Sequence, residues 1–202
     1  MRLYVTRHGE TKWNIERRMQ GHKDSPLTQK GIDNSKLLHE HLMDVRFDCV
    51  YSSPLGRAMH TAELIVGDRP LEIIPSPELK EMGFGIWEGR CSEELSQLYP
   101  GQYSAFWSNP EAYEPVEGGE SFEQLKSRVS SWLNETIIDK SYENILVVTH
   151  TCVIKELYSI INRRPLKDFW SDPVIHDTCL TIIEIEDGQT RLLLEADTSH
   201  LR

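Results

Sequence analysis

Short runs of β-branched residues alternate along this chain with longer segments of helical periodicity, and this alternation constrains the fold most. The short runs are residues 3–5, 49–51, 72–74 and 145–148, and the helical segments are 28–45, 54–65, 121–138 and 154–161. Such alternation is typical of βαβ units. We therefore predict an α/β fold, a three-layer sandwich with a mostly parallel central sheet, helices on both faces, and a closing hairpin over 181–194.

The composition indicates one globular domain over residues 1–202. The chain is 39% hydrophobic and 27% charged, and its four cysteines include no Cys-x-x-Cys pair. A net charge of −10 disfavours nucleic acid and anionic membranes as partners. The start has no apolar segment typical of a secretion signal, so we expect a cytoplasmic protein. We expect a monomer or a homodimer.

Residues 84–113 fit the alternation poorly and hold seven of the 17 aromatic residues. We predict that an insertion around 84–120 forms a small cap over the C-terminal edge of the strands. An aromatic cluster belonging to a satellite core is the alternative, and both interpretations can hold together.

Polar residues of a few kinds follow the predicted strands. Arg7 and His8 follow the first strand, Arg57 lies just after the second, Glu81 follows the third, and His150 follows the apolar run at 145–148. Ligands of parallel sheets bind beyond the carboxyl ends of the strands. Two arginines and an imidazolium suit a phosphoryl group without a metal, a histidine can attack phosphorus, and a carboxyl group can protonate the leaving oxygen.

These residues belong to motifs that resemble the histidine phosphatase superfamily, also called the phosphoglycerate mutase-like family. The motifs are Arg7-His8-Gly9-Glu10-Thr11 with Asn14 and Gln20-Gly21, Asp24 to Gly31, Ser52 to Ala62, Glu81 to Gly89, Gly118 to Ser121, and Thr149-His150. They occur in family order over nearly the whole chain. The resemblance extends to alpha-ribazole phosphatases, phosphoserine phosphatases and broad-specificity acid phosphatases.

The resemblance implies a role for each matched residue. His8 would be the nucleophile that becomes phosphohistidine, and Glu81 would be the proton donor. Arg7, Arg57 and His150 would bind the phosphoryl oxygens, and the substrate pocket would also include Asn14, Gln20 and Gly21. Many members have glycine after the second histidine, whereas this chain has Thr151, which would either donate to the phosphate or narrow the pocket. No cofactor and no metal are implied.

Three alternatives remain open at this stage. A metal hydrolase is conceivable because there are eight histidines, although the other six are scattered and surface roles are expected for them. A non-catalytic binding module of the same fold would be expected to lack one of the five candidate residues. A bisphosphoglycerate-dependent mutase must hold a second anion, and residues 82–125 contain one basic residue against eight glutamates, while Arg17, Arg18 and Lys23 keep that function open. The predicted substrate is a small phosphorylated metabolite, with an apolar or ring-bearing leaving group suited to the aromatic cap.

Overall fold

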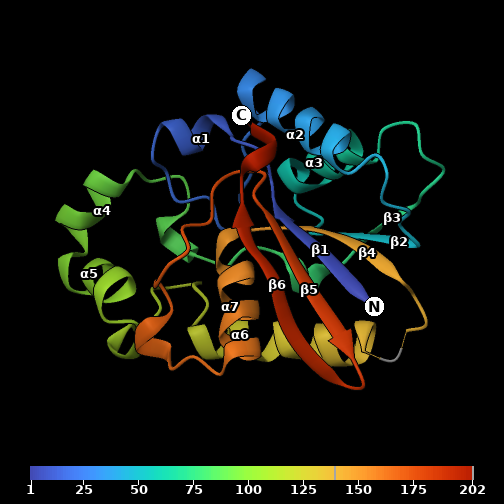
Figure 1. The fold of residues 1–202 in the computed structure, drawn as a ribbon. Helices are drawn as coiled ribbons and strands as arrows, with labels where there is room; N and C mark the ends of the chain where they lie inside the picture. Colours follow the sequence, from blue (N-terminus) through green and yellow to red (C-terminus); the bar gives the residue numbers. More distant parts are fainter. Residues whose placement is uncertain (139, 202) are drawn as a thin grey trace.

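The computed structural model describes residues 1–138 and 140–201, through which a six-stranded sheet runs (Figure 1). The strands are β1 (Arg2–Arg7), β2 (Cys49–Ser52), β3 (Ile73–Pro75), β4 (Asn144–Thr149), β5 (Leu180–Glu186) and β6 (Gln189–Asp197). Their order is β3-β2-β4-β1-β5-β6. The first four in this order are parallel, and the β5–β6 hairpin joins β1 in the antiparallel direction. The predicted mostly parallel sheet with a closing hairpin is confirmed.

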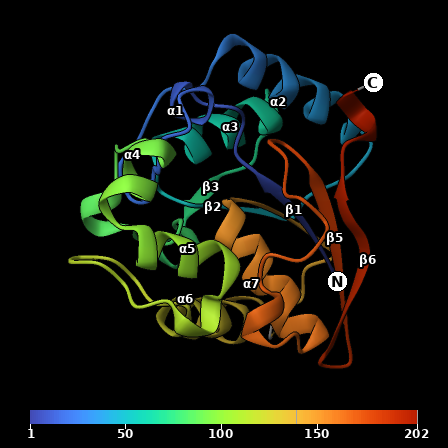
Figure 2. The ribbon, with the colours of Figure 1, turned by 90° about the vertical axis from the view of Figure 1, so that its left-hand side faces the viewer.

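Helices cover both faces of the sheet (Figures 1 and 2). On one face lie α2 (Gln29–His41) and α3 (Gly56–Val66), and on the other lie α6 (Phe122–Ser131) and α7 (Thr151–Asn162). Side-chain caps explain where two of them begin. The hydroxyl of Thr28 accepts from the N–H of Gly31, and Ser121 accepts from Gln124 in a capping box. The predicted three-layer sandwich is therefore confirmed.

Successive residues of the central strands point to opposite faces and fill two cores. The core under α6 and α7 contains Leu3, Val5, Ile145 and Val147, whereas the core under α2 and α3 contains Tyr4, Leu146 and Val148. Strand β4 is thus buried on both faces, which accounts for its unbroken apolar sequence.

The cap segment forms four short helices beside the sheet, two of them labelled α4 and α5 in Figure 1. They are η2 (Gly85–Trp87), α4 (Ser92–Leu98), α5 (Pro100–Ser108) and η3 (Pro110–Ala112). The fully buried ring of Trp87 lies 5.8–6.2 Å from four other aromatic rings of the segment. Gly85 has a φ of +52°, and a Cβ there would lie 2.1 Å from the Glu117 carbonyl oxygen, so glycine lets the two ends of the cap meet. The aromatic cluster is continuous with the core under α6 and α7, so its rings are part of that core, and the cap insertion around 84–120 stays a prediction.

Some boundaries differ from the prediction. Helix α2 ends at His41, four residues before the predicted Val45, because the chain turns there and Val45 donates to the Leu42 carbonyl. Helix α3 begins at Gly56, after Pro54, and a π-helix over Trp132–Ile137 continues α6. The remaining short helices are α1 (Lys12–Ile15), η1 (Pro77–Leu79), η5 (Leu166–Asp168) and η6 (Ser199–Leu201). Within residues 1–138 and 140–201, every helix is too short or too polar to cross a lipid bilayer.

Candidate active site

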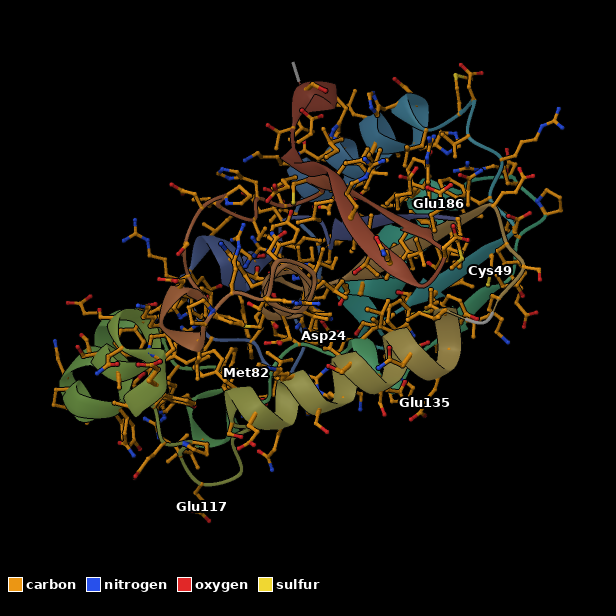
Figure 3. The ribbon with its side chains drawn as sticks, turned by 60° about the horizontal axis from the view of Figure 1, so that its bottom comes forward. Asp24, Cys49, Met82, Glu117, Glu135 and Glu186 are labelled. Carbon is orange, nitrogen blue, oxygen red and sulfur yellow. The ribbon has the colours of Figure 1, made fainter. Side chains whose placement is uncertain are left out.

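The register of β1 and β4 brings two histidines together at the carboxyl end of the sheet. Arg7 pairs with Thr149 in this register, so the next residues, His8 and His150, lie side by side with ring centroids 5.1 Å apart. The N–H of His8 donates to the Thr149 carbonyl at 3.0 Å, which extends the strand pairing into the site. In Figure 3, Asp24 and Met82, which adjoin this site, lie far from Cys49, at the opposite end of the sheet.

Hydrogen bonds fix the tautomer of His8. Its Nδ1 lies 2.8 Å from the Gly9 carbonyl oxygen, which can only accept, so Nδ1 carries the proton. Nε2 then has a free lone pair and accepts from Nε of Arg57 at 3.3 Å. Burial, together with the charges of Arg57 and Arg7, holds the pKa of His8 well below its ordinary value of 6.5. His8 is therefore a neutral imidazole with a nucleophilic nitrogen.

Arg57 is held at the floor of the site by the loop that follows α1. Its Nη1 donates to the Lys23 carbonyl at 2.7 Å and to a carboxylate oxygen of Asp24 at 3.1 Å, and Nη2 donates to the Gly21 carbonyl at 2.9 Å. Asp24 also accepts from the backbone N–H of Arg57 at 3.2 Å. A guanidinium fixed in this way is a rigid donor for an anion.

His150 is neutral in the free protein, whereas the sequence reasoning assumed an imidazolium. Nη2 of Arg57 lies 3.3 Å from Nδ1 of His150, and since a guanidinium only donates, Nδ1 accepts. Nε2 of His150 then carries the proton and donates to the hydroxyl of Ser53 at 2.8 Å. Burial and the neighbouring Arg57 hold the pKa of His150 well below 6.5.

Glu81 reaches the same site from the segment after η1. Its Oε1 accepts from the N–H groups of Met82 at 2.9 Å and Cys152 at 3.1 Å, and the residue is 8% exposed. Its carbonyl accepts from His22 at 3.0 Å and from Arg128 at 3.2 Å. Burial and the adjacent Glu81 raise the pKa of the Cys152 thiol well above 9.0, so this buried cysteine stays a thiol.

Two carboxylates of the Glu81 to Gly89 motif, Glu81 and Glu88, have different places in the structure. Glu81 lines the site cavity, whereas Glu88 does not. Glu88 Oε1 accepts from the N–H groups of His22 at 2.8 Å and Phe84 at 3.0 Å, and its Oε2 accepts from Lys23 at 3.2 Å. Glu88 therefore ties the loop that holds Arg57 to the cap.

The other predicted residues meet in one cavity of about 150 Å³. All the predicted site residues except His150 line it, namely Arg7, His8, Asn14, Gln20, Gly21, Arg57, Glu81 and Thr151. The hydroxyl of Thr11 lies 3.0 Å from Oδ1 of Asn14 and 3.1 Å from Oε1 of Gln20, which leaves both amide N–H₂ groups as donors. Nε of Arg7 is buried without a hydrogen-bond partner. The floor of the cavity is thus rich in donors for an anion.

Five apolar residues that line the cavity, Met19, Phe84, Phe106, Trp107 and Trp170, are called the rim below. Of the three cations that kept a second anion site open, Arg18 lines the cavity, and Arg17 and Lys23 do not. Arg18 already donates to Glu16 at 2.5 Å and to the Gly89 carbonyl at 2.7 Å.

Sequence reasoning missed several partners of these groups. Asp24, which accepts from Arg57, and Ser53, which pairs with His150, both lie within the motifs quoted above. The need of a buried arginine and a buried histidine for polar partners could have pointed to them. Trp170 lies 63 positions after Trp107, and no sequence signal links it to the cap. The expectation of surface histidines is wrong for His200, which is only 9% exposed.

Comparisons with known proteins identify the family of this chain. A family model described as histidine phosphatase superfamily (branch 1) matches residues 3–198. Over 170 residues the chain is 40% identical to the adenosylcobalamin/alpha-ribazole phosphatase of Escherichia coli, covering 84% of this chain and 83% of that protein. It is 31% identical over 201 residues to phosphoserine phosphatase 1 of Hydrogenobacter thermophilus, covering 100% and 94%.

A solved structure extends the likeness to the whole fold. YhfR of Bacillus stearothermophilus matches with a TM-score of 0.96 and 39% identity, covering 100% of this chain and 99% of that one. The motifs, the fold and the family model agree over nearly the full length. The chain therefore belongs to the histidine phosphatase superfamily (branch 1), the family of phosphatases that its motifs predicted.

Proposed function

We propose that the protein hydrolyses monoesters of small organic phosphates through a phosphohistidine on His8. The observation that carries this proposal is the hydrogen bond between Nδ1 of His8 and the Gly9 carbonyl. This bond places the ring proton on Nδ1 and leaves the Nε2 lone pair at the donor-rich floor of the cavity. Arg7, Arg57 and His150 bind the phosphoryl oxygens, and the amides of Asn14 and Gln20 donate to the same group. Positioning and charge stabilisation are the main requirements of phosphoryl transfer.

The reaction proceeds in two displacements. Nε2 of His8 attacks phosphorus, the ester P–O bond breaks, and the departing oxygen takes a proton from the carboxyl group of Glu81. A water molecule then attacks the phosphohistidine and gives a proton to the Glu81 carboxylate, while the P–N bond breaks and inorganic phosphate leaves. His8 is the nucleophile of the first displacement and the leaving group of the second, and Glu81 gives up a proton and regains it, so the enzyme returns to its starting state.

The apolar rim supports a leaving group with an apolar or ring-bearing body. Such a group can pack against Phe106, Trp107 and Trp170 while the phosphate lies on the floor. A mutase would need a second anion site, and the further cation of the cavity, Arg18, is already bonded to Glu16. This arrangement favours hydrolysis over the mutase reaction, in which a phosphoryl group moves between two hydroxyl groups.

Trapping of the intermediate tests the proposal. Protein mixed with a ³²P-labelled monoester and quenched without acid should carry the label on His8. His8→Ala should abolish labelling and turnover and keep the fold, whereas His60→Ala, which changes an exposed histidine of α3, should retain both. Full turnover by His8→Ala would exclude the covalent mechanism.

A further inference from the structure

A second cavity lies between α6, α7 and the segment 164–169 that follows them. It has a volume of about 280 Å³, larger than the cavity around His8, and the two share no lining residue. Its lining residues are Phe122, Glu123 and Lys126 of α6, Glu156 and Ser159 of α7, and Arg164, Leu166 and Phe169. The size falls just below the roughly 300–1,000 Å³ of sites for drug-sized ligands, so a smaller molecule fits it.

Glu156 is the unusual residue of this cavity. It is 2% exposed, and its Oε1 is buried without a hydrogen-bond partner. Burial raises the pKa of Glu156 to about 7, against a small opposing effect of Lys126. Buried carboxyl groups are normally paired or hydrogen-bonded, because an unpartnered one destabilises the fold. A ligand that donates to Glu156 would supply the missing partner.

Positive charge and aromatic rings line the rest of the cavity. Lys126 and Arg164 contribute an ammonium and a guanidinium, and Arg164 is held by a hydrogen bond of 3.1 Å to the Asp172 carbonyl. The rings of Phe122 and Phe169 lie 4.7 Å apart in an edge-to-face arrangement. The cavity thus combines an acceptor for a cation, donors for an anion and an apolar wall.

We propose that this cavity binds a free amino acid with an apolar side chain. Its ammonium donates to Glu156, with Glu123 as a second acidic neighbour, its carboxylate binds Lys126 and Arg164, and its side chain packs against the two phenylalanine rings. This site is separate from the catalytic cavity and does not depend on the function proposed above.

Calorimetric titration with three related compounds tests the charge pattern. L-leucine has both charged groups, N-acetyl-L-leucine lacks the ammonium, and L-leucinamide lacks the carboxylate. Leucine should bind, and each derivative should bind at least about tenfold more weakly, as expected for loss of one charge-assisted interaction. No binding of leucine at ~10 mM, or equal affinity for all three, would overturn the proposal.

Variants place the binding at this cavity. Glu156→Gln should weaken leucine binding at least about tenfold and leave phosphatase activity unchanged. Because Oε1 of Glu156 has no hydrogen-bond partner, the substitution should preserve the fold, which thermal melting verifies. Lys126→Gln, at an exposed position of α6, should weaken the binding of leucine and not that of leucinamide. His8→Ala should bind leucine like the wild type. Unchanged affinity in both Glu156→Gln and Lys126→Gln would show that leucine binds elsewhere and would refute the assignment.

Discussion

Nε of Arg57 lies 3.3 Å from Nε2 of His8, so the guanidinium donates to the nitrogen that we propose attacks phosphorus. This contact orients the imidazole, and it must give way when the phosphoryl group arrives. The same guanidinium reaches His150, Asp24 and two backbone carbonyls. Arg57 therefore joins the nucleophile, the phosphate site and the loop after α1 in one rigid unit.

Arg57→Lys should lower kcat/KM by about 10²–10³-fold, as is typical when one preorganised donor to a transition-state anion is lost. Lysine keeps the charge but cannot span His8, His150 and the Gly21 carbonyl in one plane. Arg90→Lys, in the cap and outside the cavity lining, is the matched control and should retain wild-type kinetics. Wild-type kcat/KM in Arg57→Lys would contradict the assigned role.

His8 should remain neutral below pH 6.5, because burial and two arginines depress its pKa. Nitrogen-15 NMR of labelled histidine, with the His8 signal assigned by its loss in His8→Ala, measures this directly. We expect the Nδ1–H tautomer to persist as the pH falls through 6.5. Protonation of His8 at or above that pH would contradict the tautomer assignment.

Glu81→Gln should slow the hydrolysis of alkyl phosphates by roughly 10²–10⁴-fold, the usual contribution of general acid–base catalysis. With para-nitrophenyl phosphate the burst of nitrophenol should persist, because this leaving group departs without a proton.

Glu88→Gln is the matched control for that substitution. The carboxylate of Glu88 ties the loop at His22 and Lys23 to the cap. Its loss should therefore raise KM by the same factor for both substrates, and it should lower the thermal stability of the protein. If Glu88→Gln shows the dependence on leaving group and Glu81→Gln does not, the acid is Glu88.

Glu156→Gln should change how stability depends on pH. A carboxyl group whose pKa is about 7 when folded and near 4.5 when unfolded binds its proton more tightly in the folded state. Its stabilising effect is complete below about pH 4.5 and is lost as the pH rises to 7 and above. The free energy of unfolding of the wild type, relative to Glu156→Gln, should therefore fall by roughly 3 kcal/mol across this range. Urea titrations at pH 4.5, 6 and 8 measure the difference, and parallel curves would contradict it.

Activity should survive dialysis against a chelator. The guanidinium groups of Arg7 and Arg57 supply the positive charge that a metal would otherwise bring to the phosphoryl group. Turnover before and after dialysis against EDTA is the measurement. Complete loss, with recovery on addition of zinc, manganese or magnesium, would require a metal in the mechanism.

The sequence predicted the fold and the floor of the site well, because both depend on local patterns. The apolar run at 145–148 indicated the central strand. His8 and His150 directly follow strands β1 and β4, and Arg57 lies in the first turn of the helix that follows β2. The cavity rim was less accessible to prediction. Trp170 reaches it only through the packing of the segment after α7 on the cap, where its Nε1 donates to the Phe106 carbonyl at 2.6 Å.

The charge states of buried side chains also could not be predicted from the sequence. The neutrality of His150 follows from its complete burial beside Arg57, which depends on how β2 and β4 pair. The unpartnered carboxyl group of Glu156 could not be foreseen either. The sequence shows only that Glu156 belongs to a helix, and the packing of α6 against α7 places it in a cavity.

The floor and the rim of the catalytic cavity come from different kinds of structure. The floor is built at strand ends and locked by backbone hydrogen bonds, whereas the rim is built from short helices and connecting segments, which accept sequence change more readily. Substrate preference can therefore diverge in evolution, or be redirected in the laboratory, through positions such as Trp107 and Trp170 while the phosphoryl chemistry stays intact. A small library at these two positions, selected on different leaving groups, would exploit this modularity.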